Sequence, residues 1–287
     1  MNIQVTDRKK RGTNKGILVV LLLLLLAIPA YLCYNTFLKD KYPIQQENIE
    51  EDIPEQSEGI EEEEIVEEEE EVVGDPYEEL LPVIEEQQAY VVVPTRIDEE
   101  NPPTLILYSH GSNTNVTENM EDQFMKDLQA YGILFTQYNY IFAASNQHGV
   151  NWGNKASIQD TLNLKEWVED SYPIQPKVYL IGFSMGGLPT MNFTTTYPEL
   201  VSKIALLAPT TKTSEWNQTR TDKVMDIDIK IWHGNKDVNV PYSSVVYFVN
   251  ALKKWGKDDI QFITLEGKTH FDVDTEYSTD ILEFFNS

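Results

Sequence analysis

Residues 90–287 alternate between short apolar runs and longer amphipathic segments. The short runs, which are typical of buried strands, cover residues 104–109, 133–138, 177–181, 203–208, 228–233 and 260–265. The segments with apolar residues at helical spacing cover residues 118–131, 155–171, 187–197, 243–255 and 275–285. Since strand alternates with helix, we expect an α/β fold in which helices cover both faces of a mostly parallel sheet.

The N-terminal part contains one long apolar run. Residues 17–38 are predicted to form a transmembrane anchor, because no charge interrupts the chain from Ile17 to Tyr34 and such a helix would span about 27 Å. Five basic residues lie in the tail 1–16, so the tail is expected in the cytoplasm and the rest outside the cell. The alternative is a signal peptide that is cleaved to release a secreted protein; the length of the run favours the anchor.

Acidic residues dominate the segment 39–89. Twenty of them lie between Glu47 and Glu86, and no Lys or Arg occurs from Tyr42 to Thr95. Like charges at this density repel one another, and few aromatic residues are present to build a core, so we predict a disordered, extended stalk. Residues 90–287 remain, which is enough for one domain with its own core.

Charge and cysteine content exclude some functions for the domain 90–287. The domain holds 15 basic and 25 acidic residues and no basic stripe, so no nucleic-acid partner is expected. The chain's single cysteine, Cys33, lies in the apolar run, so we expect neither a disulfide nor a cysteine-bound metal in the domain.

A serine stands at a glycine-rich turn between an apolar run and a helical segment. The turn reads Gly182-Phe183-Ser184-Met185-Gly186 and directly follows the run 177–181. A serine hydroxyl is a weak nucleophile unless it is held exposed beside a base, with donors ready for the developing negative charge. Glycines on both sides let the backbone turn sharply, so Ser184 is the candidate nucleophile. The alternative is a glycine-rich turn that contains a serine by chance.

Two further side chains are expected to complete a catalytic triad with Ser184. His270 lies in the loop after the last predicted strand, which ends at the same sheet edge as the serine turn, and is the candidate base. Asp237 follows the strand 228–233 and is the candidate for the carboxylate that orients this histidine. For each residue the alternative is an ordinary loop position, a surface histidine or an aspartate that caps its own turn.

A tetrahedral intermediate also needs two amide donors for its oxyanion. The candidates are the backbone amides of Met185, directly after the nucleophile, and of Ser112, in the loop after the strand 104–109. The remaining histidines near strand ends, His110 and His233, are expected to be structural.

Substrate contacts are expected from loops beside the serine turn. Asn113 follows the oxyanion candidate, and the long loop 139–154 carries Tyr140, His148 and Trp152. We expect this loop to wall the substrate pocket; the alternative is a packed surface loop.

Together these residues resemble the α/β-hydrolase superfamily. The matching pieces are His110-Gly111, the turn around Ser184, His233-Gly234 with Asp237, and His270, and their order Ser, Asp, His is that of the superfamily. The resemblance covers nearly all of residues 90–287 and is greatest to dienelactone-hydrolase-like or esterase-like serine hydrolases. Only about twenty residues separate positions 208 and 228, where many members carry a lid, so a minimal or absent lid is expected.

The resemblance implies a mechanism and a substrate class. Ser184 would form an acyl-enzyme, with His270 as base and Asp237 stabilising the imidazolium, and no metal or organic cofactor would be required. We therefore expect a membrane-anchored extracellular serine hydrolase, a carboxylesterase acting on a small-molecule ester. One alternative is a serine peptidase of the prolyl-oligopeptidase-like type acting on short peptides. Another is a non-catalytic binding module at the cell surface.

Overall fold

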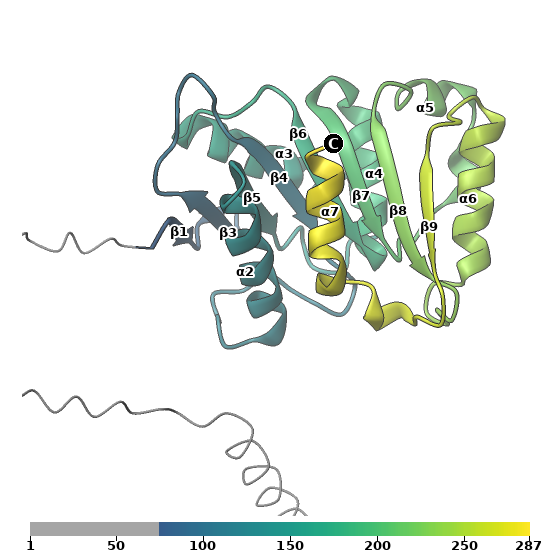
Figure 1. Cartoon of the computed structure of the whole chain (residues 1–287), viewed down its shortest axis with the longest axis horizontal. Helices are drawn as coiled ribbons and strands as arrows, with labels where there is room; N and C mark the ends of the chain where they lie inside the picture. The colour runs from purple at the N-terminus through teal and green to yellow at the C-terminus, as the bar shows by residue number, and fades with distance from the viewer. Residues whose placement is uncertain (1–74) are drawn as a thin grey trace, which may run out of the picture. The chain divides into compact units, whose positions relative to one another are not determined.

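The strands in the described part of the chain form one twisted sheet of nine members. The structure, a computed structural model, describes residues 75–287, so the predicted anchor 17–38 and the first part of the predicted stalk lie outside the described residues. The strands are β1 (Tyr77–Leu80), β2 (Val83–Ile84), β3 (Gln87–Pro94), β4 (Thr104–Ser109), β5 (Tyr140–Ser145), β6 (Val178–Phe183), β7 (Val201–Leu207), β8 (Asp228–Gly234) and β9 (Gln261–Leu265). The strand order is β1-β3-β5-β4-β6-β7-β8-β9, with β2 paired to β3 (Figure 1).

Most neighbouring strands in this sheet run parallel. The pairs from β5 through β4, β6, β7 and β8 to β9 are parallel, whereas β1, β2 and β3 form an antiparallel edge. The expected α/β fold with a mostly parallel sheet is therefore confirmed. In such a sheet the carboxyl ends of the parallel strands meet at one edge, where ligands bind.

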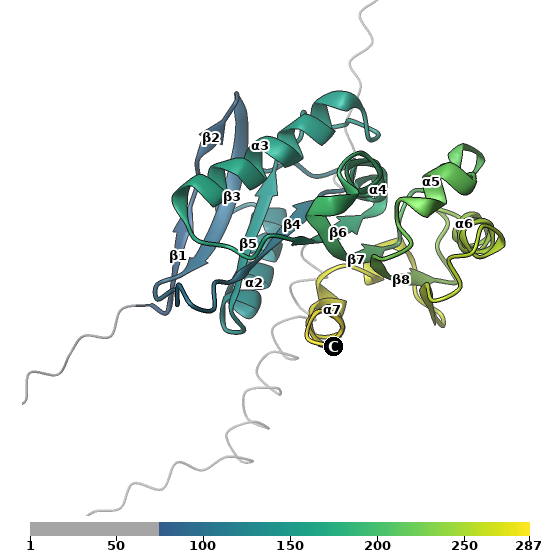
Figure 2. The same ribbon diagram turned by 90° about the horizontal axis from the view of Figure 1, so that it is seen from above.

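Helices cover both faces of the sheet. They are α2 (Gln123–Thr136), α3 (Lys155–Ser171), α4 (Gly187–Thr196), α5 (Gln218–Asp222), α6 (Tyr242–Lys254) and α7 (Ser278–Phe285). Figure 2 shows α2 and α7 on one face, and α3, α4 and α6 on the other. Each face has its own apolar core: Leu164, Phe193 and Phe248 belong to one, and Met125 and Phe285 to the other. The central strands are buried on both sides, which explains why they read as continuous apolar runs.

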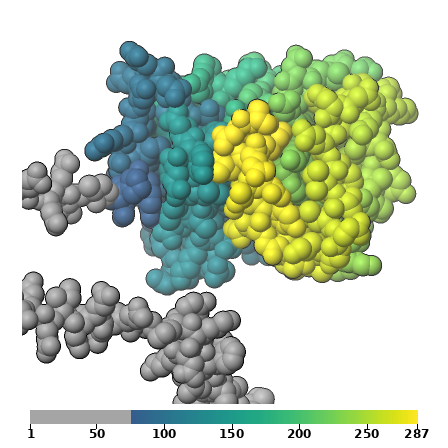
Figure 3. Space-filling model, in the orientation of Figure 1, coloured from purple at the N-terminus to yellow at the C-terminus, as the bar shows by residue number. Residues whose placement is uncertain are grey.

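The last helix is fixed by a buried lysine from the middle of the sheet. Lys203 of β7 donates hydrogen bonds from Nζ to the carbonyl oxygens of Phe284 (3.1 Å), Phe285 (3.1 Å) and Ser287 (2.6 Å). Phe284 and Phe285 are the last two residues of α7, and the last carbonyls of a helix lack partners within it, so the ammonium group satisfies them. Burial lowers the pKa of Lys203. Figure 3 shows α7 lying on the face of the domain, next to α2, with which it is in contact.

The prediction between residues 118 and 145 was wrong in two places. The expected helix 118–131 is α2, which begins at Gln123 and continues to Thr136, so the expected strand 133–138 does not form. Its residue Phe135 lies one turn beyond Tyr131 and extends the same buried helix face. The strand of this region is β5, which had been expected to be loop and whose six residues are all buried.

The predicted domain boundary at residue 90 was also wrong. Strands β1 and β2 and the start of β3 lie within residues 77–89, which had been assigned to the stalk. Glu79 of β1 accepts hydrogen bonds from the hydroxyl of Tyr90 (2.5 Å) and from Nε2 of Gln129 (2.8 Å). An acidic residue therefore finds ordered partners here, because the strand adds to the sheet edge. Among residues 75–287, no helix combines the length and the apolar character that a membrane span needs.

Candidate active site

Ser184 occupies a strained turn between β6 and α4. Its φ is 52°, in the left-handed region that costs a non-glycine residue roughly 1–3 kcal/mol. Two glycines make this turn possible, since a Cβ at Gly182 would lie 2.6 Å from Oγ1 of Thr190, and a Cβ at Gly186 would overlap the carbonyl oxygen of Ser109. The turn places Ser184 directly after the carboxyl end of β6, where it lines a pocket.

The structure brings the three triad candidates together. Nε2 of His270 lies 2.9 Å from Oγ of Ser184, and Nδ1 of the same ring lies 2.7 Å from Oδ2 of Asp237. Because a carboxylate only accepts, Nδ1 carries the proton and Nε2 accepts the hydrogen bond from the serine hydroxyl. This is the arrangement in which a histidine removes the proton of an attacking serine. All three residues are largely buried, with exposed fractions of 8%, 6% and 4% for Ser184, Asp237 and His270.

Hydrogen bonds between the segment after β8 and the segment at the end of β9 fix the positions of Asp237 and His270 relative to each other. The amide of Asn235, after β8, donates to the carbonyl of Leu265 (3.1 Å), and the amide of Lys236 donates to that of Lys268 (3.0 Å). His270 then begins a short 3-10 helix that is capped reciprocally by Thr269 and Asp272. Hydrogen bonds of the residues before and after His270 therefore fix the position of this candidate base.

Both oxygens of the Asp237 side chain accept hydrogen bonds. Its Oδ1 accepts from the amides of Asn239 (2.9 Å) and Val240 (2.8 Å), and its Oδ2 accepts from His270. The carboxylate has no exposure to solvent, so these donors replace the water that it has lost.

The loop after β4 lies against the nucleophile. A Cβ placed on Gly111 would be 3.1 Å from Cδ1 of Phe183 and 3.6 Å from Cβ of Ser184. Ser112 follows directly and lines the same pocket as Ser184. Met185 is fully buried behind the nucleophile in the 3-10 turn Ser184–Gly186. Both oxyanion candidates thus belong to segments that border Ser184.

A pocket of about 620 Å³ opens beside Ser184. Its aromatic lining consists of Phe124, Trp152, Phe183 and Phe271. Asn113, a candidate for substrate contact, also lines the pocket, together with the acidic residues Asp127 and Asp274. No Lys or Arg is among the lining residues. The pocket is therefore partly apolar and carries negative charge on the side of α2.

Sequence reasoning missed these two carboxylates. Asp127 lies on the predicted helix α2, and Asp274 comes four residues after His270. The position of Asp274 close behind a candidate catalytic histidine was the only signal in the sequence, and it does not reveal the partner on α2.

Asp274 sits between two buried tyrosines. Its Oδ1 accepts from the hydroxyls of Tyr108 (3.2 Å) and Tyr131 (3.3 Å), and burial raises the pKa of both tyrosines well above the usual range, so the hydroxyls stay donors. Burial also raises the pKa of Asp274 to about 6, with a further contribution from nearby Asp127, whereas the tyrosine hydrogen bonds lower it.

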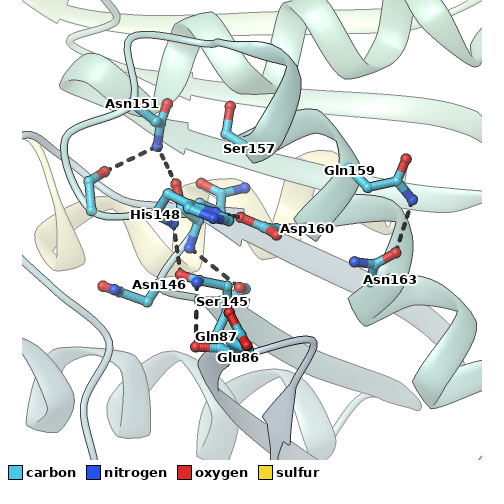
Figure 4. A network of polar contacts seen from close by, with 12 residues as sticks. Glu86, Gln87, Ser145, Asn146, His148, Asn151, Ser157, Gln159, Asp160 and Asn163 are labelled. Carbon is cyan, nitrogen blue, oxygen red and sulfur yellow. Dashed lines mark hydrogen bonds and ion pairs between the residues drawn. The ribbon is translucent and has the colours of Figure 1, made fainter.

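His148 does not line the pocket, contrary to the prediction. Its Nδ1 lies 2.6 Å from Oδ2 of Asp160 on α3, and its amide donates to Oε1 of Gln87 (2.8 Å), as Figure 4 shows. Positive φ values at Gln147 (46°) and His148 (60°) direct the ring toward α3. Tyr140 is likewise absent from the pocket, because it belongs to β5 and donates its hydroxyl hydrogen bond to Asn286.

The same loop nevertheless delivers Trp152 to the pocket. The buried Gln147 donates from Nε2 to the hydroxyls of Ser109 (3.0 Å) and Thr161 (2.8 Å), and Asn151 donates to the carbonyl of Gln147 (3.1 Å). These bonds hold the loop in a strained conformation, in which φ of Trp152 is 49°. The side chain of Trp152 lines the pocket and stays half exposed.

The histidine after β4, His110, is fully buried with both ring nitrogens against backbone carbonyls. Nδ1 lies 2.7 Å from the oxygen of Gly111 and Nε2 lies 2.9 Å from that of Asn146. It therefore ties the loop of Ser112 to the end of β5, in keeping with the structural role expected for it. Nowhere in residues 75–287 do three His, Cys, Asp or Glu side chains gather as metal ligands would.

Comparisons with known proteins agree with this topology. The family described as alpha/beta hydrolase fold matches residues 104–227. A homoserine O-acetyltransferase from Corynebacterium glutamicum is 33% identical over 88 residues, which are 29% of this chain and 23% of that enzyme. The expected resemblance to the α/β-hydrolase superfamily is therefore confirmed.

Two solved structures show the same fold at low sequence identity. A thermostable esterase has a TM-score of 0.55 and 18% identity, and the match covers 67% of this chain and 55% of the esterase. A putative dipeptidyl aminopeptidase IV from Bacteroides ovatus has a TM-score of 0.58 and 12% identity, and the match covers 70% of this chain and 33% of the peptidase. The chain thus spans about half the length of that esterase and less than a quarter of the acetyltransferase.

Asp274 should make the stability of the domain depend on pH. Its pKa is raised to about 6 from 3.8, so the folded state binds more protons than the unfolded state between these values. The free energy of unfolding should therefore fall as pH rises from about 4 to about 7, by up to about 3 kcal/mol from this group. Urea titrations of Asp274→Asn should show that this fall is absent. Asp258→Asn, at an exposed surface position, should keep the wild-type slope, and an unchanged slope in Asp274→Asn would contradict the assignment.

Proposed function

We propose that this protein is a serine hydrolase that cleaves carboxylic esters of small molecules through an acyl-enzyme. The observation that carries the proposal is the unbroken chain of hydrogen bonds from Asp237 through His270 to Ser184, beside an open pocket. Ser184 is the nucleophile, His270 the general base and Asp237 the group that orients and stabilises the imidazolium.

The proposed reaction has two steps that use the same base. In the first step Oγ of Ser184 attacks the ester carbonyl while His270 takes its proton, and the proton then passes to the departing alcohol. The amides of Met185 and Ser112 would stabilise the oxyanion. In the second step His270 activates a water molecule, which releases the acid and restores the serine. The protein's own residues supply every proton transfer in this scheme.

A serine peptidase acting on short peptides is the second candidate. The likeness to a putative dipeptidyl aminopeptidase IV supports it, but the match covers only 33% of that chain. Between β7 and β8 the present chain has only the five-residue helix α5 and short turns, so nothing in this part of the described chain would select a peptide over an ester.

We further propose that residues 17–38 anchor the enzyme in the membrane, with the catalytic domain outside the cell. The uninterrupted apolar run and the basic tail before it support this location.

Replacing the nucleophile should abolish activity. Ser184→Ala should lower kcat for a short p-nitrophenyl ester at least about a thousandfold and abolish covalent labelling by a fluorophosphonate probe, because it removes the hydroxyl that contacts the base His270. The exposed Ser214→Ala should behave as wild type. Wild-type domain that is folded but neither labelled nor active on esters would favour the non-catalytic module. Faster cleavage of peptide amides than of matched esters would favour the peptidase.

The pocket should discriminate by charge. Because Asp127 and Asp274 line it and no basic residue does, kcat/KM for a p-nitrophenyl monoester of succinate should be at least about tenfold below that for the neutral butyrate ester at low salt. Asp127→Asn and Asp274→Asn should each narrow this ratio, whereas Asp258→Asn, which removes the same charge from a remote exposed position, should not. Equal rates for the two esters in the wild type would contradict the prediction.

The location of the protein can be tested on the full chain. If residues 17–38 span the membrane, detergent should extract the protein from membranes, whereas carbonate at high pH should not. A protease added to intact cells should remove the catalytic domain. Recovery of a shortened chain in the medium would instead support the cleaved signal peptide.

A further inference from the structure

His233 lies next to the carboxylate of Asp237. It is the penultimate residue of β8, and its side chain has no solvent exposure. Its Nε2 lies 2.9 Å from the carbonyl oxygen of Val240 and 3.3 Å from Oδ2 of Asp237. Nδ1 is buried and has no hydrogen-bond partner in the described part of the chain.

These contacts identify the proton that the ring carries. A carbonyl and a carboxylate can only accept, so Nε2 must be the donor. Burial lowers the pKa of His233, which favours the neutral ring with a single proton. The proton therefore sits on Nε2 and is donated to the carbonyl of Val240, while Oδ2 of Asp237 lies 3.3 Å from the same nitrogen; Nδ1 is left without a proton.

The hydrogen bond from His233 to Val240 supports the turn that surrounds Asp237. The amides of Asn239 and Val240 donate to Oδ1, and the carbonyl of the same Val240 accepts from His233. His233 thereby holds the far end of the turn that binds one carboxylate oxygen, while it also contacts the other oxygen. Rotation of the carboxylate away from His270 would break bonds at both oxygens.

We propose that His233 is a positioning residue of the triad, which holds the carboxylate of Asp237 in the orientation that His270 requires. This inference rests on the proposed function. It goes beyond the structural role that the sequence indicated. If His233 acts by positioning, a side-chain amide at residue 233 should replace the ring only when its N–H reaches the position of Nε2.

Two neutral amide variants separate positioning from space filling. In His233→Gln the side-chain amide reaches approximately the position of Nε2, whereas in His233→Asn it reaches only that of Nδ1. We expect kcat for p-nitrophenyl butyrate to stay within about threefold of wild type in the Gln variant and to fall about 10- to 100-fold in the Asn variant, because the Asn variant loses both the hydrogen bond to Val240 and the N–H beside the carboxylate. KM should change little in both variants.

A double-mutant cycle tests whether the effect passes through Asp237. In the Asp237→Asn background, where the carboxylate is already absent, His233→Asn should lower the residual rate by less than about threefold. A general loss of folding would instead lower the rate by the same factor in both backgrounds. Thermal unfolding followed by circular dichroism reports the folding of each variant.

Three outcomes would overturn the inference while Ser184 remains reactive in the wild type. The first is equal activity of the Asn and Gln variants, and the second is an Asn effect of equal size in both backgrounds. The third comes from the wild-type protein alone, so it stands even if a variant does not fold: ¹⁵N NMR of the histidine rings that places the proton of His233 on Nδ1. Failure of the wild type to turn over any ester would instead reject the proposed function.

Discussion

The burial of one carboxylate is the constraint on which this site depends. The side chain of Asp237 has no solvent exposure, and an unpaired charge in such a position would cost several kcal/mol. It accepts hydrogen bonds from the amides of Asn239 and Val240 and from the ring of His270, and Nε2 of His233, which also carries a proton, lies 3.3 Å from its Oδ2. These donors come from β8, from the turn after it and from the loop after β9, so the carboxylate can be stabilised only when all three lie in their observed places.

The nucleophile is held in place by its backbone conformation and by steric packing, not by a buried charge. Ser184 has a left-handed backbone conformation that is held by the strand before it, the helix after it and a hydrogen bond from the amide of Thr210 to its carbonyl (2.7 Å). Close packing against Ser109 leaves no room for a side chain at Gly186. Steric packing therefore fixes the serine and buried charge fixes the base, and the 2.9 Å contact between Ser184 and His270 is where the two constraints meet.

Sequence predicted those features that depend on local periodicity and on strand ends. The helix Lys155–Ser171 was predicted with its exact bounds, and the three triad candidates could be chosen because parallel strands end at one edge. The segment after Tyr131 was assigned wrongly, since a short apolar run fits a strand and the last turn of a buried helix equally well. The strand Tyr77–Leu80 was missed because Glu79 is stabilised by residues distant in the chain, which composition does not reveal.

The pocket walls could not be predicted because they depend on long-range contacts. Gln147 sets the path of its loop through hydrogen bonds to Ser109 of β4 and Thr161 of α3, and along that path His148 lies away from the pocket and Trp152 lines it. Asp274 illustrates the same dependence in electrostatic terms. Unlike Asp237 it receives only two hydroxyl donors, so burial prevails and raises its pKa to about 6. Near neutral pH this carboxylate thus brings a poorly compensated negative charge to the pocket, where a substrate must meet it.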